Sequence, residues 1–308
     1  MLQYKLRMRQ DNWPISVAET EEKRPVCAVV LIVHGMAEYK GRYYPFMEKL
    51  SGEGFHAVAY DHRGHGGSVT TPEMYGYFGG NGATDLVEDL YNCVLYFKEK
   101  YSGCPLFLFA HSMGTIITRK FMKVYDDQVD GVILSGIPTE NPFAAQGLRL
   151  AQLITRMKGP YFRSKKLNRL VLGLFNQGYE IPNSWLSRDK EVVQRFNQDS
   201  RCGFVFTANG FETLFTMLLD IFEVKGWQVK NPQLPILIMA GTADPVIQNT
   251  EMFHKAVRFI KYRGYTQVES KLYPEMRHEL LQEIENDAVH QDVLHWLRSK
   301  SNSFIKKN

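Results

Sequence analysis

The stretch LFLFAHSMGTIITRKF, residues 106–121, decides the fold class of this chain. Its first four residues form an apolar run that is typical of a strand buried on both faces of a sheet. A helix is predicted to follow directly, over residues 113–125. A turn this sharp between strand and helix holds its central residue, Ser112, in a strained backbone conformation with the hydroxyl exposed, which suits a nucleophile.

Small residues two before and two after the serine keep such a turn clear of the neighbouring strand and helix. Gly114 meets this requirement, whereas Ala110 stands where glycine is usual. Alanine is the smallest residue that carries a Cβ, so we expect the turn to survive with slightly shifted packing. Because a five-residue pattern also arises by chance, the rest of the chain has to support the interpretation.

The sequence around this stretch alternates short apolar runs with amphipathic segments, which is typical of βαβ units on a parallel sheet. Strands are predicted in CAVVLIVHG (27–35), FHAVAYDHRG (55–64), PLFLFAHS (105–112), DGVILSG (130–136), PILIMAGTADP (235–245) and QVESKLYP (267–274). Helices are predicted at 43–53, 83–100, 113–125, 250–262 and 284–297. Sites in such folds gather beyond the carboxyl ends of the strands, where these runs end in polar residues.

Strand signals disappear between about Pro138 and Lys230, where the sequence reads as helices broken by turns. The prediction is therefore an α/β fold with a mostly parallel central sheet flanked by helices. Residues 1–137 and 231–308 would form the two parts of the core. Residues 138–230 would form a helical cap, inserted before the last strands, that covers the carboxyl edge of the sheet.

Two further polar residues follow the serine at positions from which they could reach it. Asp244 comes just after a predicted strand, in GTADP, and His278 lies in RHELLQE before the last predicted helix. Each alone has an ordinary explanation, since Asp before Pro favours a turn and a histidine there could cap a helix. Together, and in this chain order, they favour a triad with Ser112 as nucleophile, His278 as base and Asp244 as orienting acid.

Acyl transfer through such a triad needs hydrogen-bond donors for the oxyanion of the tetrahedral intermediate. One predicted donor is the backbone N–H of Met113, the residue after the nucleophile. The other is the N–H of Met36, in the loop after the first predicted strand, where Gly35 gives the backbone freedom to turn.

Five segments resemble the monoacylglycerol lipase and lysophospholipase branch of the α/β-hydrolases: HGMAEYKGRY (34–43), DHRGHGGS (61–68), AHSMG (110–114), GTADP (241–245) and RHELLQE (277–283). The resemblance covers nearly the whole chain and departs from the family pattern at Ala110. It implies an α/β-hydrolase fold, the triad and oxyanion donors named above, and hydrolysis of a monoacylglycerol, a lysophospholipid or a similar single-chain ester. The stretch 185–204 resembles the end of that family's cap, whose sequence varies most among its members, so the particular ester stays open.

Two alternatives remain. The same fold and triad serve peptidases and esterases of small or aromatic esters, and some relatives are non-catalytic binding scaffolds. Scaffolds usually lose a member of the triad, whereas all three residues are present here.

Composition and motifs argue against several other classes of function. The net charge of +4, from 37 basic and 33 acidic residues, is too small to indicate nucleic-acid binding. The four cysteines are scattered, HELLQ lacks the second histidine of a zinc helix, and His62 and His65 have no third ligand nearby, so no metal is predicted. No nucleotide motif occurs, and we expect no cofactor. Without a signal peptide or an apolar span, we expect a cytoplasmic protein.

One segment of the predicted cap has charge of a single sign. Residues 141–179 contain seven basic side chains and no acidic one, interleaved with leucines and aromatic residues. This pattern could rest on an anionic membrane surface as a peripheral contact. Alternatively, its apolar residues pack on the sheet edge or line an acyl pocket while the basic ones face water. The sequence predicts no particular oligomeric state.

Overall fold

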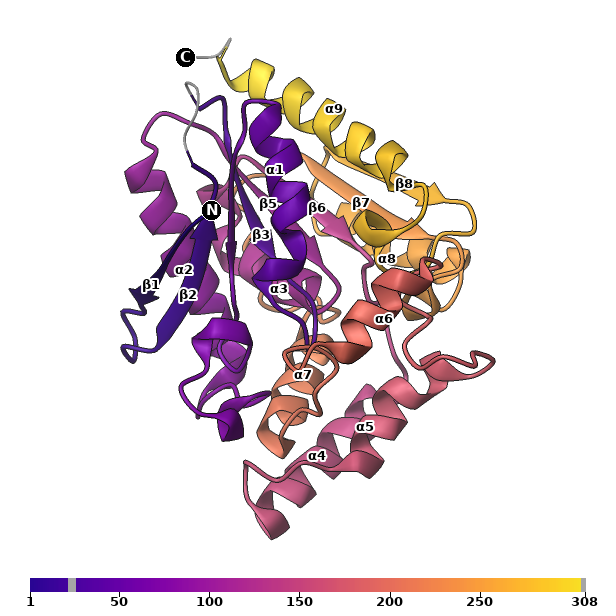
Figure 1. Ribbon diagram of the computed structural model, residues 1–308. Coiled ribbons are helices and arrows are strands. Elements are labelled where there is room, and N and C mark those ends of the chain that lie inside the picture. Colours follow the sequence, from indigo (N-terminus) through magenta and orange to yellow (C-terminus); the bar gives the residue numbers. More distant parts are fainter. Residues whose placement is uncertain (22–25, 306–308) are drawn as a thin grey trace.

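The computed structural model describes residues 1–21 and 26–305 and has an eight-stranded sheet at its centre (Figure 1). The strand order is β1-β2-β4-β3-β5-β6-β7-β8. Neighbours from β4 to β8 are parallel, whereas β1 and β2 run antiparallel at one edge. The bounds are β1 Leu2–Arg7, β2 Pro14–Glu19, β3 Val29–Val33, β4 His56–Tyr60, β5 Leu106–His111, β6 Gly131–Ser135, β7 Ile236–Gly241 and β8 Val268–Tyr273.

The six strands predicted from the sequence are β3 to β8, whereas β1 and β2, which lie side by side at one end of the sheet, were not predicted. The alternation in LQYKLR of β1 leaves every second side chain exposed, so this strand lacks the continuous apolar run that marks a strand covered on both faces. β1 and β2 form a hairpin whose inner strand pairs antiparallel with β4. The sheet is therefore mostly parallel, as expected.

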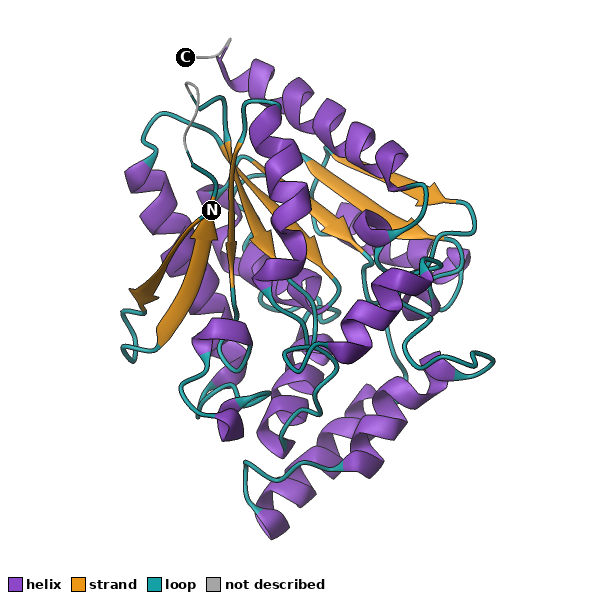
Figure 2. Cartoon of the chain, viewed as in Figure 1, coloured by secondary structure: helices purple, strands orange, loops and turns teal. Residues whose placement is uncertain are grey.

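Helices cover both faces of the sheet (Figure 2), and the side chains of β3 to β7 alternate between two cores. Leu31 of β3 faces the core under α2, α3 and α8, and Ile32 faces the core under α1 and α9. The last helix begins two residues later than predicted and extends farther. The bounds are α1 Tyr44–Gly52, α2 Gly82–Lys100, α3 Met113–Tyr125, α8 Thr250–Tyr262 and α9 Asn286–Ile305.

The segment between β6 and β7, residues 138–230, is called the inserted segment below. Its described residues form four α-helices and no strand: α4 Ala144–Lys158, α5 Lys165–Leu172, α6 Lys190–Gln198 and α7 Ala208–Asp220. These helices lie beyond the ends toward which the parallel strands point (Figure 1). α4 packs on α7, where Phe215 lies so close to Gly147 that an added Cβ would come within 2.4 Å of the ring.

Candidate active site

Ser112 lies at the turn between β5 and α3 in a backbone conformation that few residues adopt. Its φ of 51° and ψ of −117° are outside the regions favoured by non-glycine residues. The turn is held from both sides. The N–H of Ser112 donates to the carbonyl of Ser135 on β6 (3.0 Å), and the N–H of Thr115 donates to the carbonyl of Ser112 (2.8 Å). The strained conformation predicted for this serine is therefore present.

The two small residues that flank the turn meet different surroundings. A Cβ on Gly114 would lie 2.1 Å from the carbonyl oxygen of Val33, so the approach of α3 to β3 requires glycine. Ala110 belongs to β5, in register with Val33 on one side and Leu134 on the other. It is fully buried and its methyl group is part of the apolar core beneath α2 and α3. The departure from glycine thus adds a methyl group to the core.

Asp244 follows β7 and His278 follows β8, and the structure brings the two side chains together. Nδ1 of His278 lies 2.9 Å from Oδ2 of Asp244, and both residues are buried. The other carboxylate oxygen accepts a hydrogen bond from the N–H of Val246 (2.8 Å). Burial by itself lowers the pKa of His278, but the Asp244 carboxylate raises it, and the pKa stays above its usual value.

The remaining ring nitrogen of His278, Nε2, is buried and has no hydrogen-bond partner within the described ranges, Ser112 included. The ring nevertheless lies beside the serine turn. Its centroid is 4.7 Å from that of His111, the residue before Ser112. A Cβ on Gly136 would lie within 3.1 Å of both rings. Hydrogen bonds of this kind are often loose before substrate binds, so the open Nε2 is compatible with the role of a base.

The loop after β3 approaches the same turn. A Cβ on Gly35 would lie 3.2 Å from Cβ of Ser112. The N–H groups of Gly35 and Ala37 donate to Glu38 (2.5 Å) and His65 (3.2 Å), respectively. The N–H of Met36 between them has no partner in the part of the chain that the structure describes.

The second predicted oxyanion donor has an equally open N–H group. Met113 is the first residue of α3, and the first N–H groups of a helix have no partner within it. The helix dipole also favours negative charge at this end. Neither predicted donor therefore has its N–H bound to another group of the described residues, as the proposed oxyanion role would require.

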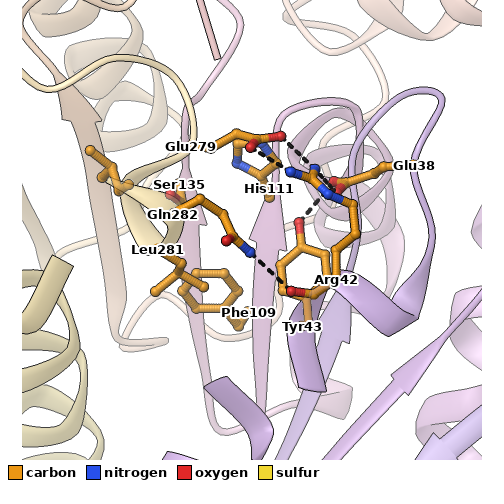
Figure 3. Close-up of a pocket in the computed structure, with 10 residues that line it drawn as sticks. Glu38, Arg42, Tyr43, Phe109, His111, Ser135, Glu279, Leu281 and Gln282 are labelled. Atoms are coloured by element: carbon orange, nitrogen blue, oxygen red, sulfur yellow. Dashed lines mark hydrogen bonds and ion pairs between the residues drawn. The ribbon is translucent and has the colours of Figure 1, made fainter. Parts of the chain in front are cut away.

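A buried ion cluster that the sequence did not predict joins two loops of the site (Figure 3). Arg42 donates two hydrogen bonds to Glu279 (2.6 and 2.7 Å) and one to Glu38 (2.7 Å). Glu279 is the residue after His278, and Glu38 binds the N–H of Gly35. Burial alone would raise the pKa of Glu38, but the Arg42 guanidinium and its other partners bring it below its ordinary value.

The cluster lines a pocket beside the serine turn, and Figure 3 shows Arg42 between the two carboxylates with His111 close by. Burial lowers the pKa of His111 to about 4, so this ring is neutral at neutral pH. The only sequence signal for the cluster was the spacing of Glu38 and Arg42, four residues apart. Among the described residues, no group of three or more His, Cys, Asp and Glu side chains could hold a metal ion.

Comparison with known proteins identifies the family. Residues 24–285 match the hydrolase family described as "Serine aminopeptidase, S33". The chain belongs to this family. It is an α/β-hydrolase of the monoacylglycerol lipase branch, and the fold and enzyme class predicted from the sequence are confirmed.

Three proteins illustrate the similarity of this α/β-hydrolase to characterised relatives. It is 26% identical to the monoacylglycerol lipase of Mycolicibacterium smegmatis, over 88% of this chain and 88% of that protein. It is 27% identical to the monoglyceride lipase of Homo sapiens, over 83% and 80% of the two chains. The structure of a carboxyl esterase from Bacillus coagulans, in complex with glycerol, covers 97% of this chain and 98% of the esterase with a TM-score of 0.89 and 23% identity.

Proposed function

We propose that this α/β-hydrolase cleaves carboxylic esters through an acyl-enzyme on Ser112, with His278 as the general base and Asp244 as the acid that orients it. The observation that carries the proposal is the hydrogen bond of His278 to Asp244 beside a strained serine. Asp244 fixes the proton on Nδ1 of the imidazole and leaves Nε2 to accept the proton of the serine hydroxyl. The tautomer follows because a carboxylate only accepts hydrogen bonds.

The reaction would proceed in two halves. The hydroxyl oxygen of Ser112 attacks the ester carbonyl while Nε2 of His278 takes its proton, and the imidazolium then protonates the leaving alcohol. Water attacks the acyl-enzyme with His278 as base again and releases the fatty acid. In both halves the N–H groups of Met36 and Met113 would bind the oxyanion, and each such donor typically contributes about 100-fold to 1000-fold in rate.

We propose that the substrates are single-chain esters such as monoacylglycerols or lysophospholipids, and that the inserted segment is a cap over the site. The names of the relatives, monoacylglycerol lipase and monoglyceride lipase, support this class. An apolar cluster of the inserted segment also supports it, because Trp185 of this cluster lies 5.2 Å from the His278 ring, centroid to centroid. An acyl chain entering the site would meet this apolar wall.

A peptidase is the second candidate, because the family description names an aminopeptidase. An unpaired acidic side chain in the site would stabilise the free ammonium of an aminopeptidase substrate. The carboxylates of Glu38 and Glu279, which lie beside the site, are both bound to Arg42. Because Arg42 already pairs with both carboxylates, they favour an ester without a free ammonium over an aminopeptidase substrate.

The deciding experiment compares purified wild type with Ser112→Ala on p-nitrophenyl esters of two to sixteen carbons, a monoacylglycerol, a lysophospholipid and an aminoacyl arylamide. We expect the wild type to prefer acyl chains of eight carbons or more, and Ser112→Ala to lose at least about 1000-fold in kcat, since removal of a nucleophile disables the whole triad. An optimum at two to four carbons would exclude the lipid class. Faster cleavage of the arylamide would favour the peptidase, and full ester turnover by Ser112→Ala would exclude the mechanism.

We also propose that α4 and α5 make a peripheral contact with anionic membranes. Several large apolar side chains on and between these helices are exposed: Leu150, Leu153, Met157, Tyr161, Phe162 and Leu170. Basic side chains on the same two helices are exposed as well: Arg149, Arg156, Lys158, Lys165, Lys166 and Arg169. Exposure of both kinds together favours a lipid surface over the alternative in which the apolar residues are all packed inside. No helix of the described ranges is long and apolar enough to cross a bilayer.

A further inference from the structure

A short stretch of the inserted segment, residues 184–189, runs along the loop that carries His278, residues 277–283. We call the first the strap and the second the base loop. The N–H of His278 donates to the carbonyl of Trp185 (3.4 Å), and the N–H of the next residue donates to the carbonyl of Leu186 (2.8 Å). The two segments are therefore joined by main-chain hydrogen bonds at the base itself.

Side chains extend this contact to both ends of the base loop. At its start, Arg277 donates to the carbonyls of Ser184 (2.6 Å) and Ser187 (3.1 Å). Near its end, the hydroxyl of Ser187 donates to the carbonyl of Gln282 (2.8 Å). The strap thus holds the base loop before and after His278.

The buried carboxylate of Glu283 forms hydrogen bonds with both the strap and the base loop. The side chain of Glu283 has no solvent exposure. Its Oε2 accepts from Nε of Arg188 (2.8 Å), and its Oε1 accepts from the N–H groups of Arg188 (3.2 Å) and Arg277 (2.8 Å). A buried charge is stable only when it is paired and hydrogen-bonded, as this one is. Glu283 therefore fixes the strap and the residue before His278 at the same time.

We infer that Glu283 and Arg188 are positioning residues for His278, so that the inserted segment takes part in orienting the proposed base. This inference rests on the proposed function. Asp244 fixes one nitrogen of the imidazole, but the direction of Nε2 also depends on where the main chain of the base loop lies. A displacement of about 1 Å of a catalytic group can cost about 100-fold in rate, and neither Glu283 nor Arg188 has to touch substrate to prevent it.

The test compares Glu283→Gln with Glu285→Gln. Glu285 is a matched control, because it also pairs with Arg188 but is 60% exposed. Active sites are titrated with a fluorophosphonate, and kcat and KM for a single-chain ester are measured per active site. We expect Glu283→Gln to lower kcat about 10-fold with KM changed less than about 3-fold, because orientation of the base affects the chemical step rather than binding. Glu285→Gln should stay within about 2-fold of wild type.

Arg188→Ala and Arg188→Lys provide a second pair in case Glu283→Gln does not fold. Arg188→Ala leaves Glu283 bonded to the N–H of Arg277, and we expect it to fold and to lose about 5-fold in kcat, with partial recovery in Arg188→Lys. Wild-type kcat per titrated site in both Glu283→Gln and Arg188→Ala would overturn the inference and leave the proposed function intact. Failure of the wild type itself to react at Ser112 would overturn the proposed function and the inference with it.

Discussion

The charges around His278 determine the pH range in which this residue can act as a base. Its ring is buried, which disfavours the imidazolium, but it faces the Asp244 carboxylate, with Glu279 and Glu38 farther away. The effect of the carboxylates is larger than that of burial, so the pKa of His278 is raised. The protonated form, which cannot accept a proton from Ser112, therefore persists to a higher pH than in an ordinary histidine.

We accordingly expect kcat/KM to rise with pH and to reach half its plateau above pH 6.5, the ordinary pKa of histidine. Asp244→Asn removes the charge that raises the pKa of His278 most. In this variant the rise of kcat/KM with pH should therefore lie at lower pH; we call this rise the acid limb of the profile. The plateau of kcat/KM should fall by up to about 10,000-fold, because the tautomer of His278 is no longer fixed. Glu275→Gln, at a side chain that is 86% exposed, is the control and should leave the limb unchanged. An acid limb that stays in place in Asp244→Asn would contradict this account.

Residues that carry the chemistry were easier to predict than residues that hold them in place. Ser112, Asp244 and His278 each follow a predicted strand, and their order along the chain matches a known pattern. Nothing in the sequence around Glu279 and Arg42 distinguishes these two residues from ordinary surface charges. Only the contact between the loops after β3 and β8 in the structure shows that Arg42 and Glu279 form a buried ion pair.

At the scale of elements, strands buried on both faces were predictable and the edge hairpin was not. The strands β3 to β7 are buried along their whole length and their sequences are largely apolar, so the sheet core could be recognised from these runs. β1 is largely exposed and the buried β2 is short and carries polar residues, so local sequence carries little information about their pairing. The helices α4 and α5 were predictable as helices, but the exposure of their apolar residues depends on how they pack.

The exposed faces of α4 and α5 lead to a prediction about membrane binding. We expect wild type to co-sediment with vesicles that contain anionic lipid at low salt, and less so at high salt, because each basic residue near the surface contributes about 1 kcal/mol that salt screens. Met157→Ser and the double change Lys165→Glu with Lys166→Glu should each weaken binding. Tyr262→Ser, which removes a 78% exposed ring from α8, is the control. Equal binding at low and high salt would count against the electrostatic part of the contact.

At the scale of the whole molecule, the parallel sheet gathers loops from distant parts of the sequence at one edge. The loops after β3, β5, β7 and β8 bring Gly35, Ser112, Asp244 and His278 together, although they span most of the chain. The inserted segment adds a second layer, since its strap is bonded to the base loop. We therefore regard this segment as part of the proposed site as well as a cover for it.

The most direct test of the central claim is to treat the folded protein with an alkyl fluorophosphonate and to map the adduct by mass spectrometry of its peptides. The account predicts one adduct, on Ser112, that is absent from Ser112→Ala and forms at least about 100-fold more slowly in His278→Gln, since the hydroxyl reacts poorly without its base. A folded wild type that stays unmodified at Ser112, or that carries its adduct on another residue, would contradict the account.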